Sequence, residues 1–491
     1  MNVSQPESTS ANSAKAANGN KREVSVTLAA TLLKMQTAQR KNPAPTYEER
    51  LDALERLERT LLRNKDAICD AVSHDFGNRS RHESLVAEVF VTLQGLKYAK
   101  THLAEWMETR HRETSWAFLP GRSEVQYQPL GVVGIISPWN YPVQLAIAPL
   151  VSVLAAGNRA MLKPSELTPR CSELLRDMMA EAFDPDHVTV ITGGPEVGEA
   201  FTRLPFDHLV FTGSTKLGKL VMRAAAENLV PVTLELGGKS PAIVGEDMAI
   251  DVAARKVMLG KLFNAGQTCI APDYVLVPEG KMAAFVEAAK TIVKDMYPTL
   301  ATNPDYTSIV NARHYDRLKG YVEDATAKGA RAVECNPAGE TLAPELRKLA
   351  PTLLLDTTDA MDVMQDEIFG PLLPVVPYKS LAEAINFVND RPRPLALYYF
   401  GHNEAHIDRV LKETTSGGVS INETMAHIAQ DDLPFGGVGP SGMGHYHAFE
   451  GFEQFSKKKP IFRQARLNAT GLLRPPYGTL VETFLKVVLG K

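Results

Sequence analysis

Cys269 ends a stretch whose residue types could support nucleophilic chemistry. The segment from Lys261 to Cys269 has the sequence KLFNAGQTC and continues as IAPDY. A helix pattern rich in Ala, Lys, Met and Leu begins near Asp251, and Pro272 prevents its continuation past the cysteine. Unpaired backbone N–H groups at such a break can stabilise a thiolate or an oxyanion. Most free cysteines are simply small buried hydrophobes, so the neighbouring motifs must decide between the two interpretations.

Two other polar residues lie in surroundings that suit an acid–base catalyst and an oxyanion donor. Glu235 interrupts the apolar strand pattern 232–236 and precedes two glycines. Desolvation there would raise its pKa toward that of a useful base, although a buried Glu can equally be structural. Asn140 lies between Pro138 and Pro142. Its amide could donate to an oxyanion, but an asparagine that forms a turn is the commoner explanation.

Two glycine-rich stretches partly match phosphate-binding loops. Residues 437–442 fit G-x-G-x-x-G but follow a polar loop instead of a strand, so the context of a dinucleotide loop is missing. Residues 213–219 nearly match a P-loop, yet Leu220 replaces the Ser or Thr that would hold magnesium, which disfavours an NTPase. Gly213 and Ser214 still lie where a strand pattern gives way to a helix pattern. That junction suits either a dinucleotide pyrophosphate or an ordinary capped helix.

The strand and helix patterns predict the elements that position these residues. Short apolar strands alternate with helices over 131–236, which predicts a parallel, doubly wound sheet with its ligand site at the carboxyl ends of the strands. A second alternating run extends from Pro241 to about 420 and predicts a second α/β domain. Helical patterns at about 24–39, 47–76 and 83–107 and an alternating strand at 124–128 come before them. Residues 433–444 are expected to form a folded loop with positive φ angles.

Composition excludes several classes of protein. The 491 residues carry 53 basic and 57 acidic side chains, a net charge of −4, and these charges are interspersed, so no nucleic-acid partner is indicated. The four cysteines are too scattered for a disulfide framework or a zinc site, which favours a reducing, cytoplasmic setting without a metal. Residues 1–22 lack an apolar core and are expected to be a disordered tail. The apolar stretch 480–489 is too short and too charged to be a stable membrane anchor.

Seven motifs make the sequence similar to the aldehyde dehydrogenase superfamily over about residues 25 to 460. In chain order they are Pro138-Trp139-Asn140, Lys163-Pro164-Ser165-Glu166, Phe211-Thr212-Gly213-Ser214, Leu234-Glu235-Leu236-Gly237-Gly238, Gly266-Gln267-Thr268-Cys269, Glu367-Ile368-Phe369-Gly370-Pro371 and Pro434-Phe435-Gly436-Gly437. Residues 269–274, 394–398, 419–422 and 442–447 resemble the class-three-like branch, and the bacterial coniferyl aldehyde dehydrogenases in particular.

The resemblance implies an α/β fold with two doubly wound α/β domains, one for the cofactor and one for catalysis, and a small β oligomerisation arm. The dinucleotide-binding domain is expected at 23–235, with the oligomerisation strand at about 122–130. The catalytic domain is expected at 236–421, and residues 422–491 should form a C-terminal return segment and complete the arm. A homodimer is expected, because an unpaired exposed strand edge at the arm would be a liability.

The resemblance also implies a reaction. An aldehyde, either aromatic such as coniferyl aldehyde or medium to long-chain aliphatic, would be oxidised to the carboxylic acid with NAD or NADP. Cys269 would attack the carbonyl, and Asn140 with the Cys269 N–H would hold the oxyanion. After hydride transfer, water activated by Glu235 would hydrolyse the thioester. Transfer of the acyl group to coenzyme A, or a non-catalytic binding or structural role, are the alternatives.

Cofactor roles follow from the same resemblance. Glu367 would bind the nicotinamide ribose with Phe369 beside the ring, and Trp139 belongs to the same set of cofactor residues. Lys163 and Glu166 would hold the adenosine ribose, and Gly213 with Ser214 the pyrophosphate. The Glu166 carboxylate would disfavour a 2′-phosphate, which gives a preference for NAD. The aromatic residues Trp106, Trp116, Phe118 and His427 could stack on an aromatic substrate or simply pack.

Overall fold

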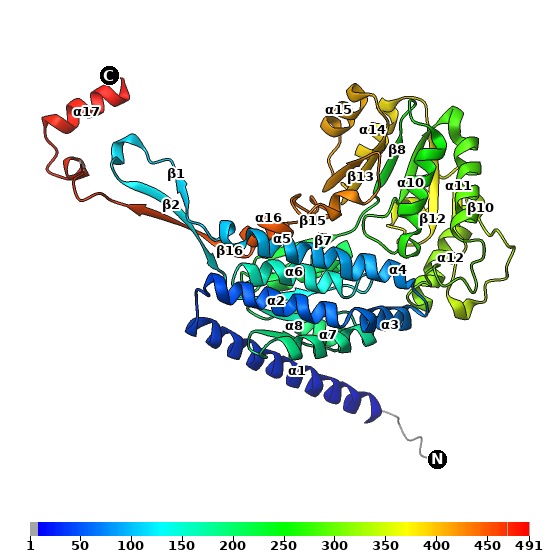
Figure 1. Cartoon of the computed structure of the whole chain (residues 1–491), viewed down its shortest axis with the longest axis horizontal. Helices are drawn as coiled ribbons and strands as arrows, with labels where there is room; N and C mark the ends of the chain where they lie inside the picture. Colours follow the sequence, from blue (N-terminus) through cyan, green and yellow to red (C-terminus); the bar gives the residue numbers. More distant parts are fainter. Residues whose placement is uncertain (1–7, 469, 491) are drawn as a thin grey trace, which may run out of the picture.

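The computed structural model describes residues 8–468 and 470–490, which form two α/β bodies and a projecting arm (Figure 1). The first sheet has the strand order β15-β7-β6-β3-β4-β5. All of its pairings are parallel except that of β15 with β7. Its strands are β15 (Gly442–Met443), β7 (Val232–Leu236), β6 (His208–Gly213), β3 (Val132–Ile136), β4 (Arg159–Lys163) and β5 (Val188–Val190).

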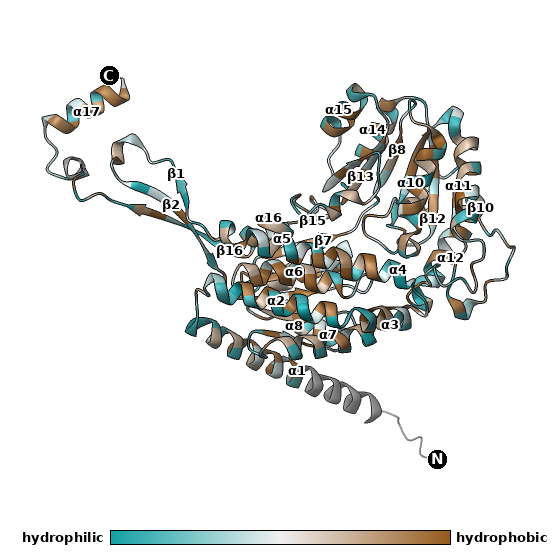
Figure 2. Cartoon of the chain, in the orientation of Figure 1, coloured by the Kyte–Doolittle hydropathy of each residue, from teal (hydrophilic) through white to brown (hydrophobic). Residues whose placement is uncertain are grey.

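Both faces of this sheet are buried, which explains why its strands are almost continuously apolar. Val132 belongs to a core with α1 (Ser8–Lys41), α8 (Pro195–Thr202) and α9 (Thr215–Ala226). Its neighbour Val133 belongs to the opposite core. The helices on that side are α2 (Tyr47–Arg63), α3 (Lys65–Phe76), α5 (Val91–Trp106), α6 (Gln144–Ala155), α7 (Pro169–Ala182) and α16 (Ala448–Gln454). Helix α6 is hydrophobic on all sides, as Figure 2 shows, because it is buried between the sheet and the outer helices.

The second sheet has the strand order β10-β11-β12-β9-β8-β13-β14, with β10 antiparallel to β11 and the other pairings parallel. Its strands are β10 (Arg331–Glu334), β11 (Thr352–Leu355), β12 (Leu372–Tyr378), β9 (Tyr274–Pro278), β8 (Pro241–Val244), β13 (Ala396–Phe400) and β14 (Gly418–Ile421). The helices packed on its two faces are α10 (Ile250–Leu262), α11 (Met282–Met296), α12 (Ala312–Ala327), α14 (Leu381–Asn389) and α15 (Glu404–Glu413). The predicted fold class is confirmed by these two α/β sheets.

The arm is an antiparallel sheet of β1 (Arg110–Arg112), β2 (Arg122–Pro129) and β16 (Ser456–Arg463), followed by the C-terminal helix α17 (Thr479–Leu489). Strand β2 contains the predicted strand at 124–128 and pairs with β16 along its whole length. The arm and α17 extend away from both bodies (Figure 1). No helix in the described part of the chain is long and apolar enough to cross a bilayer.

The helical part of the chain differs from the prediction in three places. Helix α1 begins at Ser8, so residues 8–22 are helical where a disordered tail was expected; residues 1–7 of that tail lie outside the described residues. The pattern at 47–76 is divided at Asn64 into α2 and α3. The pattern at 83–107 contains a π-helical stretch, Leu85–Phe90, between α4 (Arg81–Ser84) and α5. π-Helical turns are rare and often occur near functional sites.

The glycine-rich segment at 433–444 contains a short strand that sequence patterns did not indicate. Strand β15 pairs with β7, and Gly442 lies opposite Glu235. Gly442 has φ +143°, and a Cβ atom at this position would lie 2.1 Å from the Leu234 carbonyl oxygen, so a side chain would break this pairing. Gly439 and Gly444 also have positive φ angles, as expected for this segment. The pairing brings the C-terminal part of the chain beside Glu235.

Candidate active site

Cys269 lies on an irregular loop that begins where α10 ends at Leu262. Asn264 and Ala265 have left-handed backbone conformations, with φ 52° and 51°. Gly266 follows with φ +76°, and a Cβ atom there would lie 2.3 Å from the Gly370 carbonyl oxygen. Four free thiols are present in the described residues: Cys69, Cys171 and Cys335 are buried, whereas Cys269 is only half-buried. The expected break after the helix is therefore confirmed. Cys269 is the most accessible of the four described thiols.

Gln267 holds the cysteine loop in place through its buried side chain. Its Nε2 donates hydrogen bonds to the carbonyl oxygens of Asn264 at 3.0 Å and Ser308 at 3.1 Å. Its Oε1 accepts a hydrogen bond from the Val310 N–H at 3.0 Å. These bonds use the acceptor and both amide hydrogens of a side chain that is 0% exposed. The loop is therefore rigidly fixed next to the 308–310 segment.

Asn140 is hydrogen-bonded directly to the cysteine loop. Its Nδ2 donates to the Gln267 carbonyl oxygen at 3.2 Å, and its own carbonyl oxygen accepts from Asn264 Nδ2 at 3.1 Å. The adjacent Tyr141 hydroxyl is 2.6 Å from Thr268 Oγ1. An amide NH₂ group has two hydrogens, so Asn140 retains one for another acceptor. The structure thus brings the predicted oxyanion donor and the predicted nucleophile to one place.

Glu235 is the second candidate that lies close to Cys269. It is 2% exposed on β7, and neither carboxylate oxygen has a hydrogen-bond partner within the described residues. The Tyr446 hydroxyl and the Thr212 side chain lie near it and lower its pKa, but burial is the larger effect and raises the pKa to about 7. A carboxyl group with that pKa can exchange a proton at neutral pH.

The thiol of Cys269 is influenced by two carboxyl groups. Burial raises its pKa well above the ordinary range, and the nearby charges of Glu235 and Glu367 raise the pKa further. The backbone N–H groups of Cys269 and Ile270 lie against the sulfur and act in the opposite direction. Nearby negative charge favours the neutral thiol, so the thiolate needs those N–H groups or an added positive charge to form.

Glu367, Phe369 and Trp139 form a second cluster next to the thiol. The Glu367 carboxylate lies against Gly237, where a Cβ atom would be 2.1 Å from its oxygen, and burial raises its pKa to about 8. Its Oε1 has no partner among the described residues. Phe369 has φ 49°, and its ring contacts the Trp139 ring edge-on with centroids 5.3 Å apart. A buried carboxylate oxygen without a partner beside two aromatic rings fits a bound ribose and nicotinamide.

The loop that carries Glu367 is held by a buried ion pair. Lys239 Nζ contacts Asp273 and donates to the carbonyl oxygens of Val363 at 2.8 Å and Asp366 at 2.9 Å. The other Asp273 oxygen accepts from the Ile368 N–H at 2.9 Å. Sequence reasoning did not identify this pair. It fixes both ends of the short segment in which Glu367 lies.

The remaining predicted cofactor residues follow neighbouring parallel strands. Ile136 of β3 is in register with Lys163 of β4 on one side and with Phe211 of β6 on the other, so Lys163 and Gly213 share the carboxyl edge of the sheet. Lys163 Nζ contacts Glu166 at 2.7 Å. Burial alone would raise the pKa of Glu166, but the Lys163 hydrogen bond and a backbone N–H together lower it.

Ser214 caps helix α9 by accepting a hydrogen bond from the Leu217 N–H at 3.4 Å. The capped-helix interpretation of the 213–219 stretch is therefore correct, and it leaves the dipole of α9 directed at the same sheet edge. This edge, the N-terminus of α9 and the free Glu367 oxygen fit a dinucleotide that extends from Lys163 toward Cys269. Its individual contacts stay predictions.

Arg79 and Glu88 form a fully buried ion pair behind Asn140. Arg79 Nη1 is 2.9 Å from Glu88 Oε1 and donates to the Asn140 carbonyl oxygen at 3.0 Å. Glu88 Oε2 accepts from the N–H groups of Val143 and Gln144 at 3.1 and 2.8 Å. Sequence reasoning missed this pair. A signal existed, because Glu88 interrupts the apolar run 85–90 in the same way that Glu235 interrupts its strand.

The sequence model of the aldehyde dehydrogenase family matches residues 1–461. The chain belongs to the aldehyde dehydrogenase family. It is 53% identical over 460 residues to a probable coniferyl aldehyde dehydrogenase of Caulobacter vibrioides, which covers 92% of this chain and 95% of that protein. It is 50% identical over 465 residues to a coniferyl aldehyde dehydrogenase of a Pseudomonas species, which covers 94% and 96% of the two chains.

Solved aldehyde dehydrogenases share this fold. A substrate-bound AldH of Staphylococcus aureus superposes with a TM-score of 0.88 at 38% identity, covering 94% of this chain and 99% of its own. An NAD⁺ complex of a Mycobacterium tuberculosis aldehyde dehydrogenase has a TM-score of 0.81 at 28% identity, covering 91% of each chain. The protein is thus an NAD(P)-dependent aldehyde dehydrogenase that oxidises an aldehyde to the carboxylic acid. The coenzyme A and non-catalytic alternatives are not favoured.

Breaking the Arg79–Glu88 pair should lower the stability of the protein. The Glu88→Gln variant keeps the size of the side chain but leaves the Arg79 guanidinium buried without its negative partner. Because breaking a buried ion pair in this way is strongly destabilising, the free energy of unfolding should fall by about 3 to 5 kcal/mol, measured by urea denaturation. Glu413→Gln, which breaks an exposed pair with Arg409, serves as the control and should unfold like the parental protein. A Glu88→Gln protein of parental stability would contradict the structural role of this pair.

Proposed function

We propose that this enzyme oxidises coniferyl aldehyde and related aromatic aldehydes through a thioester on Cys269, which water activated by Glu235 then hydrolyses. The convergence of Cys269, Asn140 and Glu235 supports the chemistry. The names of the two bacterial relatives at 53% and 50% identity support the aromatic substrate. Medium to long-chain aliphatic aldehydes are the second candidate, because the motifs at 269–274 and 442–447 resemble a branch of the family that takes both classes of aldehyde.

In this mechanism the Cys269 sulfur forms a bond to the carbonyl carbon, the C=O π bond breaks to leave an oxyanion, and the thiol proton passes to solvent water. The resulting oxyanion accepts hydrogen bonds from the remaining Asn140 amide hydrogen and the Cys269 backbone N–H. NAD(P), when bound, supplies the acceptor for the hydride that leaves the same carbon. The carbon then forms a thioester with Cys269, which is open to attack by water.

Glu235 is the proposed base for that water. Its pKa of about 7 means that the carboxylate form is populated at neutral pH and can accept the proton of the attacking water. Only the deprotonated carboxylate acts as a base, and its fraction falls as pH falls through about 7, so hydrolysis should slow over that range. Glu235 lies on a strand that is paired on both sides, which limits the movement of its backbone.

The predicted cofactor residues keep their roles in this proposal. Trp139, Glu367 and Phe369 would enclose the nicotinamide and its ribose. Lys163 and Glu166 would hold the adenosine ribose, and Gly213 with Ser214 the pyrophosphate. The Lys163–Glu166 contact supports this, because a carboxylate held beside Lys163 would repel a 2′-phosphate and so favour NAD.

The proposal also covers the division of the chain into domains. We place the dinucleotide-binding domain at 23–235, the catalytic domain at 236–421 and the return segment with the arm at 422–491.

We propose a cytoplasmic homodimer in which the arm pairs with a second copy. Exposed apolar side chains on the arm support this, because Trp116 is 63% exposed and Phe462 is 47% exposed. Within one copy of the chain, Trp116 and Phe118 lie on the projecting arm, where their rings contact Phe484 and Phe462.

The role of Glu235 predicts a separation of the two half-reactions. In Glu235→Gln, a single turnover of hydride transfer should proceed at close to the parental rate, while acyl-enzyme hydrolysis should slow by about 100-fold or more. The parental rate of hydrolysis should rise with pH and reach half its maximum near 7, and the variant should lack this dependence. Rapid-quench and stopped-flow measurements separate the steps. Parental hydrolysis in Glu235→Gln would contradict the assignment.

The substrate proposal is tested by competition. With both aldehydes present, kcat/KM for coniferyl aldehyde should exceed that for octanal by about tenfold or more, measured from the ratio of acid products. A preference for octanal would favour the aliphatic class, and oxidation of neither aldehyde would reject both substrate candidates.

A further inference from the structure

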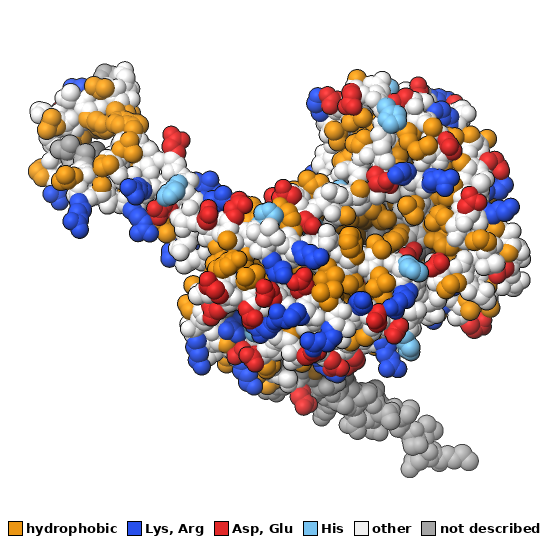
Figure 3. All heavy atoms as spheres, viewed as in Figure 1, with side chains coloured by type: hydrophobic (Ala, Val, Ile, Leu, Met, Phe, Trp, Pro, Cys, Tyr) orange, Lys and Arg blue, Asp and Glu red, His pale blue; other side chains and the backbone are white. Residues whose placement is uncertain are grey.

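Glu83 lies on the short helix α4 of the first body and reaches the Cys269 loop of the second. Its Oε2 accepts a hydrogen bond from the Asn264 backbone N–H at 3.2 Å and another from Thr307 Oγ1 at 3.1 Å. The two bodies meet across a hollow that Figure 3 shows edged by apolar side chains. A carboxylate that is half-buried between them is costly unless it accepts hydrogen bonds, and Glu83 accepts two.

The Asn264 N–H that Glu83 binds belongs to the left-handed turn on the Cys269 loop. Asn264 and Ala265 have φ 52° and 51°, a conformation that residues with a side chain rarely adopt and that costs energy. Such a turn persists only where its surroundings hold it. Glu83 supplies one of these contacts from outside the loop.

Glu83 also ties the loop to the segment that begins at Thr307. The Thr307 side chain is 2% exposed, and its neighbour Ser308 accepts a hydrogen bond from Gln267 Nε2. The loop therefore meets this segment at two points, one through Glu83 and one through Gln267. Burial raises the pKa of Glu83 to about 7, because it outweighs the opposing effects of the Arg79 charge and the two hydrogen bonds.

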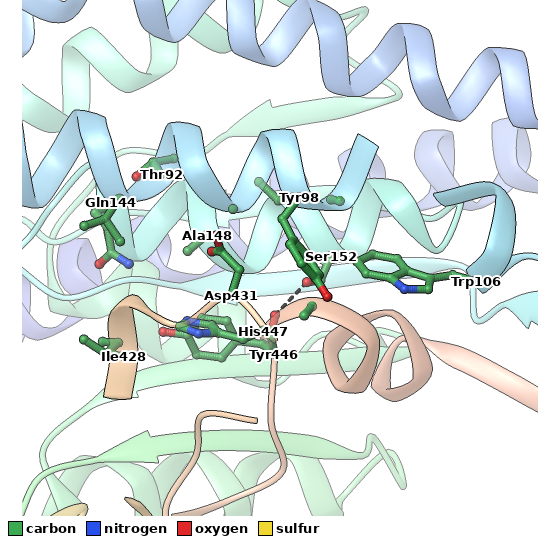
Figure 4. Close-up of a pocket in the computed structure, with 15 residues that line it drawn as sticks. Thr92, Tyr98, Trp106, Gln144, Ala148, Ser152, Ile428, Asp431, Tyr446 and His447 are labelled. Atoms are coloured by element: carbon green, nitrogen blue, oxygen red, sulfur yellow. Dashed lines mark hydrogen bonds between the residues drawn. The ribbon is translucent and has the colours of Figure 1, made fainter. Parts of the chain in front are cut away.

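Glu83 is one of two carboxylates that support the site from the same short segment. Glu88 lies five residues further on, in the π-helical stretch Leu85–Phe90, whose backbone bonds join residues five apart. Glu88 Oε2 accepts the Gln144 N–H at 2.8 Å at the start of α6, next to Thr92 of α5 (Figure 4). Glu83 reaches the loop of the nucleophile instead. This segment therefore contacts both the oxyanion side and the nucleophile side of the site.

We infer that Glu83 is a positioning residue for the nucleophile: its carboxylate holds the turn at Asn264, and the turn aims the Cys269 sulfur at the substrate carbonyl. This inference rests on the proposed function, in which Cys269 attacks the aldehyde. Glu83 acts through the backbone of the loop and takes no part in bond formation. An error of about 1 Å in the position of a reacting group can slow a reaction by about 100-fold, so loss of this support should slow the attack without weakening cofactor binding.

The test measures hydride transfer in the first turnover by stopped-flow NADH fluorescence. NAD is saturating, and so is whichever of coniferyl aldehyde and octanal the parental enzyme oxidises faster. In Glu83→Ala the rate should fall by about tenfold to 100-fold, while the Kd for NAD stays within about twofold of the parental value. Glu83→Gln keeps an acceptor oxygen at the same distance from the backbone and should stay within about threefold of the parental rate. Glu83→Asp keeps the charge but withdraws the acceptor by one methylene group, so it should be slow as well.

Asp207→Ala is the matched control. Asp207 Oδ2 accepts the Val132 N–H at 2.7 Å at the amino end of the first sheet, so this variant removes a partly buried carboxylate that binds a backbone N–H away from the site. It should lose stability in urea as Glu83→Ala does, but keep the parental first-turnover rate.

Three results would overturn the inference: parental hydride transfer in Glu83→Ala, a Glu83→Gln variant as slow as Glu83→Ala, or an equally slow Asp207→Ala. If Glu83→Ala does not fold, the comparison of Glu83→Asp with Glu83→Gln decides, and equal rates in these two variants overturn the inference.

Cys269→Ser, assayed alongside, separates this inference from the proposed function. If Cys269→Ser is inactive and Glu83→Ala transfers hydride at the parental rate, only the role of Glu83 is wrong. If Cys269→Ser still transfers hydride, the proposed nucleophile is wrong and the role of Glu83 is rejected with it.

Discussion

The hydrogen bonds between the Cys269 loop and the segment after β3 are the constraint on which the site depends. Cys269 belongs to the chain segment between α10 and β9 in one body, and Asn140 follows a strand of the other sheet. The Asn140, Gln267 and Asn264 amides join them through buried backbone carbonyls. Buried polar groups are costly unless paired, so these segments separate only with the loss of several bonds at once. The sulfur and the oxyanion donor consequently hold a fixed geometry.

The buried carboxylates around this junction differ in whether a cation lies within hydrogen-bonding distance of them. Glu88 is paired with Arg79 and accepts from two backbone N–H groups, so it supports the chain at and just after Asn140 even though burial raises its pKa. Glu235 and Glu367 lack such cations at hydrogen-bonding distance among the described residues, and burial raises their pKa values to about 7 and 8. Carboxyl groups with raised pKa values are poor contributors to stability but are able to exchange protons or to pair with a ligand.

The sequence predicted the parts of the site that depend on local pattern. Cys269 follows a helix and precedes a proline, Glu235 interrupts an apolar strand, and each pattern required only neighbouring residues for its recognition. The parallel strands were predictable for the same reason. The Arg79 pairing with Asn140 and the β15 register opposite Glu235 were not, because both join segments far apart in the chain. Helix α1 extends to Ser8 although residues 8–22 lack the apolar periodicity by which helices are recognised.

If Cys269 forms a thioester with the oxidised substrate carbon, that species can be trapped on the enzyme when its hydrolysis is slowed. Glu235→Gln is mixed with NAD and coniferyl aldehyde, quenched in acid and analysed by intact-protein and peptide mass spectrometry. We expect an adduct of the aldehyde mass less two hydrogens on the peptide that contains Cys269, and no such adduct in Cys269→Ser. If no adduct forms during hydride transfer, or if it forms on another residue, Cys269 is not the nucleophile.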